Sequence, residues 1–233
     1  MPNRRVMDSL LDSPSKRIVD RYVESVCRDI HGPILDVGAG KSRYRYLFPD
    51  YTSLDIKGSE GIDIIADARH LPFREESFTS VICTAVLEHI ENPWNVVHEI
   101  GRALRKEGFL LLWLPFIQPR HDIPHDFLRF TEEGVRTLVR DSCSGLEIKN
   151  LIPCGGFFST LAGIWWWPFT YFFQKNKIIA LCILPAYLAF ILLSALDRFD
   201  YEHRFSLGYI VTCGKIEDSN DFRTISRTDN STQ

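Results

Sequence analysis

The stretch Leu35-Asp36-Val37-Gly38-Ala39-Gly40 decides the fold, because an apolar segment of strand length runs there directly into two glycines. Glycine lets the backbone turn sharply and approach a ligand closely. On both sides of this stretch, short apolar runs alternate with segments of helical spacing, which is the pattern of βαβ units. The sequence therefore predicts an α/β fold, doubly wound around a mostly parallel sheet.

Further strands and helices are expected along most of the chain. Apolar runs of strand length lie at 34–37, 51–56, 62–66, 79–84, 109–114, 146–153 and 206–213. Helical spacing of apolar residues is found over about 14–30, 93–104 and 131–139.

Three kinds of nucleotide site begin with a glycine turn of this sort. A P-loop has the pattern G-x-x-x-x-G-K-[ST], and here Leu35 stands where its first glycine belongs. A dinucleotide fingerprint has the pattern G-x-G-x-x-G, and Arg43 stands where its third glycine belongs. The remaining pattern is D-x-G-x-G, in which Asp36 favours a cofactor with positive charge, such as a sulfonium joined to an amino-acid moiety.

Two further acids follow neighbouring strands. Asp55 lies nineteen residues after Asp36 at the end of the second strand, where a carboxylate accepts both ribose hydroxyls. Asp67 and Ala68 follow the third strand, where an acid and a backbone amide can hold the edge of an adenine. Each acid alone would be an ordinary turn residue. Together they predict a nucleotide site, because open α/β sheets bind ligands at the carboxyl ends of their strands.

A family resemblance adds to this interpretation. The segments LDVGAGKSRYRYLFP (35–49), LDI (54–56), DARHLPF (67–73), SFTSVICTAVLEHIENPW (77–94) and EIGRALRKEGFLLLWLPF (99–116) resemble, in order and spacing, the type 11 group of class I S-adenosylmethionine (SAM)-dependent methyltransferases. The resemblance implies a Rossmann-like, seven-stranded sheet with an antiparallel last strand, and SAM as the cofactor. It implies SAM contacts by Asp36, Gly38, Gly40, Asp55 and Asp67, with Ala68 beside them. The segment 84–89, beginning at Thr84, would line the methyl-donor side.

The acceptor side is expected in the loop after the fifth strand. His121, His125 and Asp126 lie in this loop, and His89 lies beside the methyl group in the family geometry. These four are the predicted catalytic residues, with His121 the first choice for a base and His89 the second. A base is needed only for an un-ionised hydroxyl or amine. Alternatively, Asp126 and Arg129 pair to fold the loop.

The string H-x-x-P-x-D-x-x-R-[FY]-T, found here from His121 to Thr131, also occurs in a subset of similar methyltransferases, some encoded among cell-surface polysaccharide genes. It points to a small acceptor that is lipophilic or related to glycans. Thr131 is also well placed as the N-cap of the next helix.

An apolar insertion interrupts the domain before its last strand. Residues 151–173 and 178–196 carry no charge, and the second run is close to the ~20 residues that span a bilayer. Trp165-Trp166-Trp167 would lie in mid-membrane in a full span, although Trp prefers the interface. A monotopic or re-entrant hairpin on the cytoplasmic membrane face is therefore expected. A buried helical cap or a dimer interface is the alternative.

The composition limits the cellular compartments and the classes of partner that are expected. Six scattered cysteines without ligand spacing indicate a reducing compartment and no metal site. A net charge of −3 does not imply a nucleic-acid partner. The N-terminus lacks the apolar core of a signal peptide. We expect a cytoplasmic protein that associates with the membrane surface through residues 157–196.

The chain is expected to divide into five parts. They are a helical N-terminal segment (1–32), a SAM-binding Rossmann-like domain (33–155), an apolar helical insertion (156–200), a strand that rejoins the sheet (201–216) and a disordered tail (217–233). The predicted function is SAM-dependent methyl transfer. The alternatives are a catalytically weak SAM-binding scaffold and a membrane-anchored interaction protein.

Overall fold

The computed structural model describes residues 12–26, 30–200, 202 and 204–216. Most of the predicted N-terminal segment before residue 12, the end of the predicted helix at residues 27–29 and the predicted disordered tail 217–233 lie outside the described residues.

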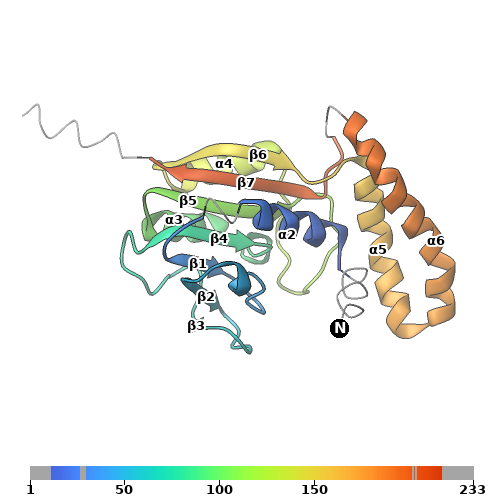
Figure 1. Cartoon of the computed structure of the whole chain (residues 1–233), viewed down its shortest axis with the longest axis horizontal. Coiled ribbons are helices and arrows are strands. Elements are labelled where there is room, and N and C mark those ends of the chain that lie inside the picture. The colour runs from blue at the N-terminus through green and yellow to red at the C-terminus, as the bar shows by residue number, and fades with distance from the viewer. Residues whose placement is uncertain (1–11, 27–29, 201, 203, 217–233) are drawn as a thin grey trace, which may run out of the picture.

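A seven-stranded sheet forms the centre of the molecule (Figure 1). Its strands are β1 (Ile34–Val37), β2 (Tyr51–Asp55), β3 (Ile64–Ile65), β4 (Phe78–Thr84), β5 (Leu104–Pro115), β6 (Leu146–Pro153) and β7 (Gly208–Lys215). They are ordered β3-β2-β1-β4-β5-β7-β6, with β7 antiparallel to both of its neighbours. The predicted Rossmann-like sheet with an antiparallel last strand is confirmed.

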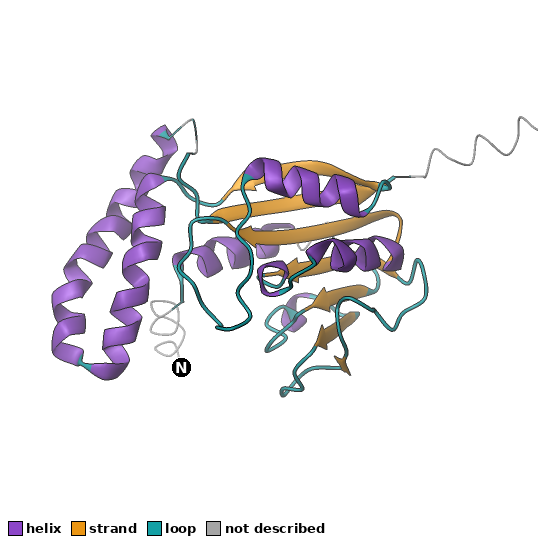
Figure 2. Cartoon of the chain, turned by 180° about the vertical axis from the view of Figure 1, so that it is seen from behind, coloured by secondary structure: helices purple, strands orange, loops and turns teal. Residues whose placement is uncertain are grey.

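Helices cover both faces of this sheet. On one face lies α2 (Pro14–Val26), which buries Val19 and Val23 in a core with β1 and β5. On the opposite face lie α3 (Pro93–Ala103) and α4 (Glu132–Ser142), whose apolar residues complete a second core (Figure 2). Thr131 caps α4 by accepting a hydrogen bond from the Gly134 amide at 3.1 Å, as its side chain and position predict. Short 3-10 turns η1 (Arg45–Leu47) and η2 (Leu87–His89) follow β1 and β4.

Strand β5 begins five residues earlier than the sequence predicts. Leu104 pairs with Phe78, and the next pair joins Phe109 to Ser80, so the register shifts between them. Glu107 lies inside this irregularity with a φ of 59°. The extra residues form a bulge. The polar composition of Lys106-Glu107-Gly108 is typical of a turn, so the sequence alone does not show that the strand already begins before it.

The apolar insertion forms a helical hairpin beside the sheet. It consists of α5 (Phe157–Lys175), α6 (Lys177–Leu193) and the 3-10 turn η3 (Ser194–Phe199). The carboxyl ends of the parallel strands point toward it (Figure 1). Asp197 fixes the root of the hairpin, since its carboxylate accepts hydrogen bonds from the amides of Gly156, Phe158 and Ser159 at 2.8–3.0 Å.

The hairpin also contacts the rest of the protein through α2. The Arg17 guanidinium donates a hydrogen bond to the Tyr187 hydroxyl at 3.0 Å. Inside the hairpin, Phe169 stacks on Tyr187 with ring centroids 5.4 Å apart. The two helices therefore share a small core of their own and are attached to the domain at both the root and the side.

Candidate functional site

The glycine turn after β1 has the conformation that its sequence predicts. Gly38 has a φ of +69°, and a Cβ at this position would lie 2.2 Å from a methyl carbon of Val86. Gly40 also has a positive φ, +58°. Its amide donates a hydrogen bond to Asp55 Oδ2 at 3.0 Å, and Asp55 Oδ1 accepts another from the Lys57 amide at 2.8 Å. The ends of β1 and β2 are thus joined through Asp55.

Asp36 is buried within β1 beneath this turn. The Tyr51 hydroxyl donates a hydrogen bond to Asp36 Oδ2. Burial raises the pKa of the Asp36 carboxyl to about 7, although the Tyr51 hydrogen bond and the nearby charge of Arg43 oppose the rise. A cationic ligand group close to Asp36 would favour its ionised form.

This raised pKa predicts a pH-dependent cofactor affinity. If a cationic group of SAM binds best to ionised Asp36, the carboxyl must lose its proton on binding below pH 7, and the Kd for SAM is expected to rise about tenfold from pH 8 to pH 6. Titration calorimetry at both pH values measures this change. Asp36→Asn should remove the step, and a wild-type Kd that stays constant between pH 6 and pH 8 would contradict the role of Asp36.

The other predicted cofactor residues lie at the same edge of the sheet. Asp67 and Ala68 follow β3, and the Asp67 carboxylate accepts a hydrogen bond from Arg69 Nη2 at 2.6 Å. Thr84 ends β4, and its hydroxyl accepts a hydrogen bond from Arg43 Nη2 at 3.0 Å. Sequence reasoning used Arg43 only to exclude a dinucleotide fingerprint. The structure adds a link from the glycine turn to the end of β4.

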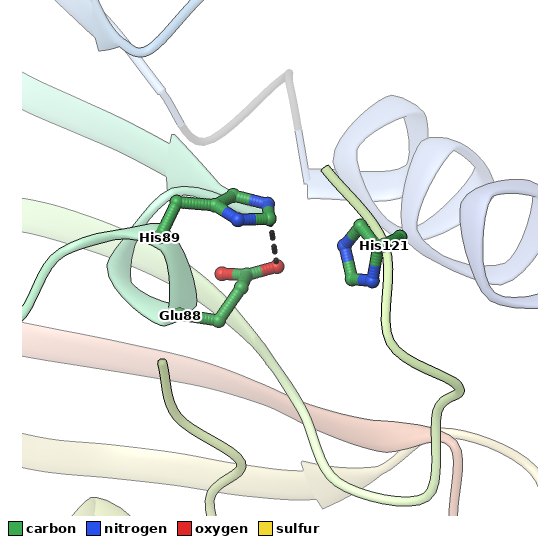
Figure 3. A group of neighbouring side chains, drawn as sticks. All are labelled: Glu88, His89 and His121. Carbon is green, nitrogen blue, oxygen red and sulfur yellow. Dashed lines mark ion pairs between the residues drawn. The ribbon is translucent and has the colours of Figure 1, made fainter. Parts of the chain in front are cut away.

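Two histidines meet across the loops that follow β4 and β5. His89 belongs to η2, and its ring meets that of His121 edge to face with centroids 4.9 Å apart. His89 Nδ1 lies 2.6 Å from the carbonyl oxygen of His125. This contact is a hydrogen bond when Nδ1 carries the proton, which leaves His89 Nε2 unprotonated in the neutral ring. Nε2 lies 3.8 Å from Glu88 Oε1 (Figure 3).

Glu88 is the site residue that sequence reasoning missed. Its side chain is fully buried, and neither carboxylate oxygen has a hydrogen-bond partner among the residues that the structure describes. Burial raises the pKa of this carboxyl to about 8. In the sequence Glu88 looks like an ordinary residue at the start of a turn, and only the fold shows that the segments around it exclude water.

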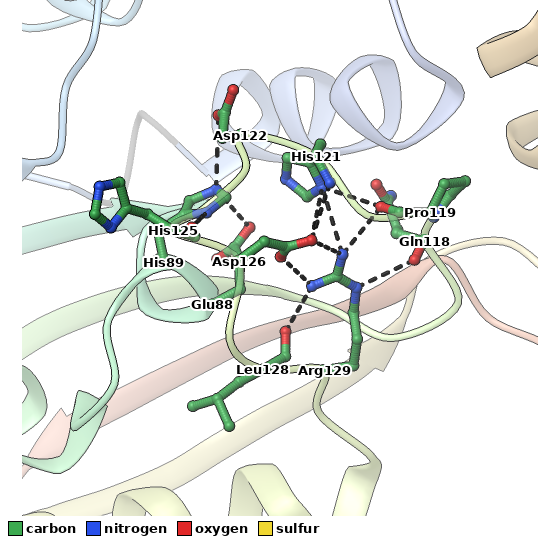
Figure 4. A network of polar contacts seen from close by, with 10 residues as sticks. All are labelled: Glu88, His89, Gln118, Pro119, His121, Asp122, His125, Asp126, Leu128 and Arg129. Carbon is green, nitrogen blue, oxygen red and sulfur yellow. Dashed lines mark hydrogen bonds and ion pairs between the residues drawn. The ribbon is translucent and has the colours of Figure 1, made fainter.

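The loop after β5 is folded around an ion pair (Figure 4). The Arg129 guanidinium donates to both oxygens of Asp126 at 2.6 and 2.8 Å, and Asp126 Oδ2 also accepts a hydrogen bond from the His121 amide at 2.9 Å. These contacts hold the pKa of Asp126 well below its usual range, the hydrogen bonds from Arg129 being the largest cause. The ring of His125 points away from the His89–His121 pair, so only its carbonyl contributes there.

The helical hairpin lies next to this loop. The His121 ring lies 5.7 Å from that of Trp167 in α5, measured between centroids. Beside them is a shallow hollow, lined by the start of α2, the segment 117–119, Gly163, Trp167 and Leu207. The loop that carries His121 is therefore in contact with the apolar insertion.

Comparisons with known proteins identify the domain. Residues 35–112 match the family described as "Methyltransferase domain". Over these residues the chain resembles a methyltransferase domain. The matched stretch contains the glycine turn, Asp55, Asp67 and the segment from Thr84 to His89.

One relative and two solved structures illustrate what the chain is similar to. An uncharacterized protein of Methanocaldococcus jannaschii, MJ1123, is 31% identical over 99 residues, which are 39% of this chain and 48% of that protein. The chain thus matches about half the length of this relative. The [4+2]-cyclase SpnF shares the fold with a TM-score of 0.55 and 20% identity, over 84% of this chain and 80% of the cyclase. The YcgJ protein of Bacillus subtilis has a TM-score of 0.51 and 13% identity, over 87% and 99% of the two chains.

Outside the methyltransferase domain, one helical segment among the described residues is long and apolar enough to cross a membrane. It is Lys177–Phe199, in which an 18-residue window has a mean hydropathy of 2.5 and 11% of that window is buried inside the protein.

Proposed function

We propose that this protein transfers the methyl group of SAM to a small lipophilic or glycan-related acceptor at the cytoplasmic face of a membrane. One observation carries the proposal: the glycine turn of the methyltransferase domain and the His89–His121 pair lie at the same sheet edge, and His121 touches the apolar hairpin. The cofactor, the ionisable groups and the lipophilic surface are therefore neighbours.

The cofactor residues have separate roles in this proposal. Gly38 and Gly40 let the backbone approach the amino-acid part of SAM, and ionised Asp36 adds negative charge below it. Asp55 accepts hydrogen bonds from the ribose hydroxyls. Asp67 and the amide of Ala68 hold the adenine, while Thr84 borders the methyl group.

The rate of methyl transfer depends more on how the acceptor and the methyl group are positioned than on chemical activation of the acceptor. The acceptor atom forms a bond to the methyl carbon while the carbon–sulfur bond breaks, and S-adenosylhomocysteine leaves as a neutral thioether. Alignment of the two reactants and exclusion of water supply much of the rate. If the acceptor is a hydroxyl or an amine, its proton passes to a base. In this proposal His121 and His89 supply the base, with Asp126 positioning His121 and the carbonyl of His125 orienting His89.

The hairpin supports the membrane part of the proposal. Large apolar side chains are exposed along α6, including Ile178 at 76%, Leu181 at 67% and Leu192 at 77%. An apolar surface of this extent is normally covered by lipid or by a partner. A catalytically weak scaffold is the less favoured function, because it has no need of the ionisable pair His89 and His121 beside the cofactor edge.

Replacing Asp55 with Ala is expected to weaken SAM binding by about 1–3 kcal/mol, the cost of losing a charged hydrogen-bond partner. Titration calorimetry measures the change, with Asp50→Ala as the control because Asp50 is an exposed acid near the start of the same strand. Equal affinity of the wild-type protein for NAD and SAM would contradict the assignment of the cofactor site.

A further inference from the structure

Three possible metal ligands meet where the loops after β4 and β5 face each other. Glu88, His89 and His121 each offer one ligand atom, and these atoms lie within 4.8 Å of one another. Figure 3 shows the Glu88 carboxylate directed between the two imidazoles. The ligands come from segments more than thirty residues apart, which is why the spacing of histidines in the sequence predicted no metal site.

The buried carboxylate is the part of this cluster that requires a partner. Within the described part of the chain, both carboxylate oxygens of Glu88 lack a hydrogen bond, whereas the Glu88 carbonyl accepts hydrogen bonds from the amides of Phe127 and Leu128 at 2.8 and 3.2 Å. A buried polar group without a partner is costly, and a buried charge without one costs more. A cation between Glu88 and the histidines would satisfy the carboxylate.

The histidines are oriented in the way that metal ligands are. A metal-binding histidine donates its second ring N–H to a carbonyl or carboxylate, which fixes the ring. His89 Nδ1 lies 2.6 Å from the carbonyl of His125, and His121 Nδ1 lies 3.1 Å from that of Pro119. In the tautomers that donate from Nδ1 to these carbonyls, Nε2 of each ring is left for another partner. Arg129 Nη2 lies 3.5 Å from His121 Nδ1 but donates at shorter distances to Asp126 Oδ2 and to the Pro119 carbonyl, 2.8 and 3.0 Å, so it does not need Nδ1 as an acceptor.

We propose that Glu88, His89 and His121 bind a divalent transition-metal ion on the acceptor side of the methyltransferase domain. Two histidines and one carboxylate with open positions form a ligand set used for catalytic zinc and related ions, whereas Mg²⁺ prefers oxygen ligands. Ligand atoms around such an ion are about 3–4 Å apart, so the loop of His121 moves inward by about 1 Å. Asp122 Oδ2, which is exposed and 3.9 Å from His89 Nε2, can complete the set.

This inference deepens the proposed function and rests on it for the role of the ion, but not for its binding. A metal ion at this place would supply positive charge to an acceptor oxygen and lower the pKa of a hydroxyl bound to it. In the metal-bound form His89 and His121 would act on that proton through the ion, whereas in the metal-free protein they act as bases.

The test uses the full chain, stripped of metal with a chelator and titrated with Co²⁺ as a spectroscopic probe. We expect visible absorption that saturates at one Co²⁺ per chain and is displaced by Zn²⁺ but not by Mg²⁺. Glu88→Gln and His121→Asn should each weaken Co²⁺ binding at least tenfold. His125→Ala should retain it, because the ring of His125 points away from the cluster.

Absence of saturable Co²⁺ binding by the folded wild-type chain would overturn the proposal. A Co²⁺ affinity equal to that of the wild-type chain in folded Glu88→Gln and His121→Asn would overturn it as well, because the ion would then lie elsewhere. SAM titration of the same samples keeps the two proposals apart. If the metal-free protein binds SAM but no Co²⁺, only the metal site is contradicted. If it binds Co²⁺ but not SAM, only the proposed cofactor function is contradicted.

Discussion

Replacing His121 with Asn should lower methyl-transfer turnover by about 10²–10⁴-fold, the range expected when a group that handles the acceptor's proton is lost. The Kd for SAM should change by less than about twofold, because a group that acts after cofactor binding affects turnover alone. Asn keeps a donor for the carbonyl of Pro119 but has no atom in the place of Nε2. Turnover is measured with labelled SAM and a total membrane extract as the source of acceptor.

A matched variant separates chemistry from folding. His98 lies on α3, where its ring contacts the carbonyl of Ser142, and His98→Ala should leave both turnover and SAM affinity unchanged. Should His121→Asn lose turnover, SAM affinity and thermal stability together, the loop after β5 has a structural role and the assignment of His121 is wrong.

The second large effect concerns the hairpin. We expect the wild-type protein to pellet with membranes, to resist high salt and to be released by detergent. Changing Ile178, Leu181 and Leu192 to Lys should move it to the soluble fraction, since these side chains are among the most exposed apolar groups of α6. Each large aliphatic side chain contributes about 1.5–3 kcal/mol when it is buried. Three such losses lower the partition coefficient of the protein between membrane and water by about 10³-fold or more.

A control is needed because added lysines raise solubility in general. Ile65 on β3 is a comparably exposed aliphatic residue, at 67%, far from the hairpin in the fold. Ile65→Lys should leave the protein in the membrane fraction. A wild-type protein that is a monodisperse, soluble monomer without detergent would mean that the hairpin does not attach to membranes.

Much of the fold could be predicted because its signals are local. Each buried strand is a short apolar run, and the glycines after β1 lie where the backbone adopts a positive φ. Thr131 marks the start of α4 through its own side chain. The hairpin is likewise visible as two uncharged runs separated by Lys175-Asn176-Lys177, and Asn176 caps α6 with its side chain.

What could not be predicted depends on contacts between distant segments. The burial of Glu88 results from packing against the loop after β5, and the bond from Tyr51 to Asp36 joins two neighbouring strands. Asp126 illustrates the difference. Its pairing with Arg129 three residues later was one of two interpretations, and only the geometry shows both of its oxygens engaged. The direction of the His125 ring is set by the same folded loop.

Transfer of label from SAM to an acceptor tests the central claim most directly. Purified full-length protein is incubated with methyl-labelled SAM and with separated lipid, glycan and soluble-metabolite fractions of cells. The proposed function predicts label in the lipid fraction or in a lipid-linked glycan, dependent on the protein and lost in Asp55→Ala at limiting SAM. Binding of SAM without label in any fraction would contradict methyl transfer, and label confined to the soluble metabolites would contradict an acceptor held at the membrane.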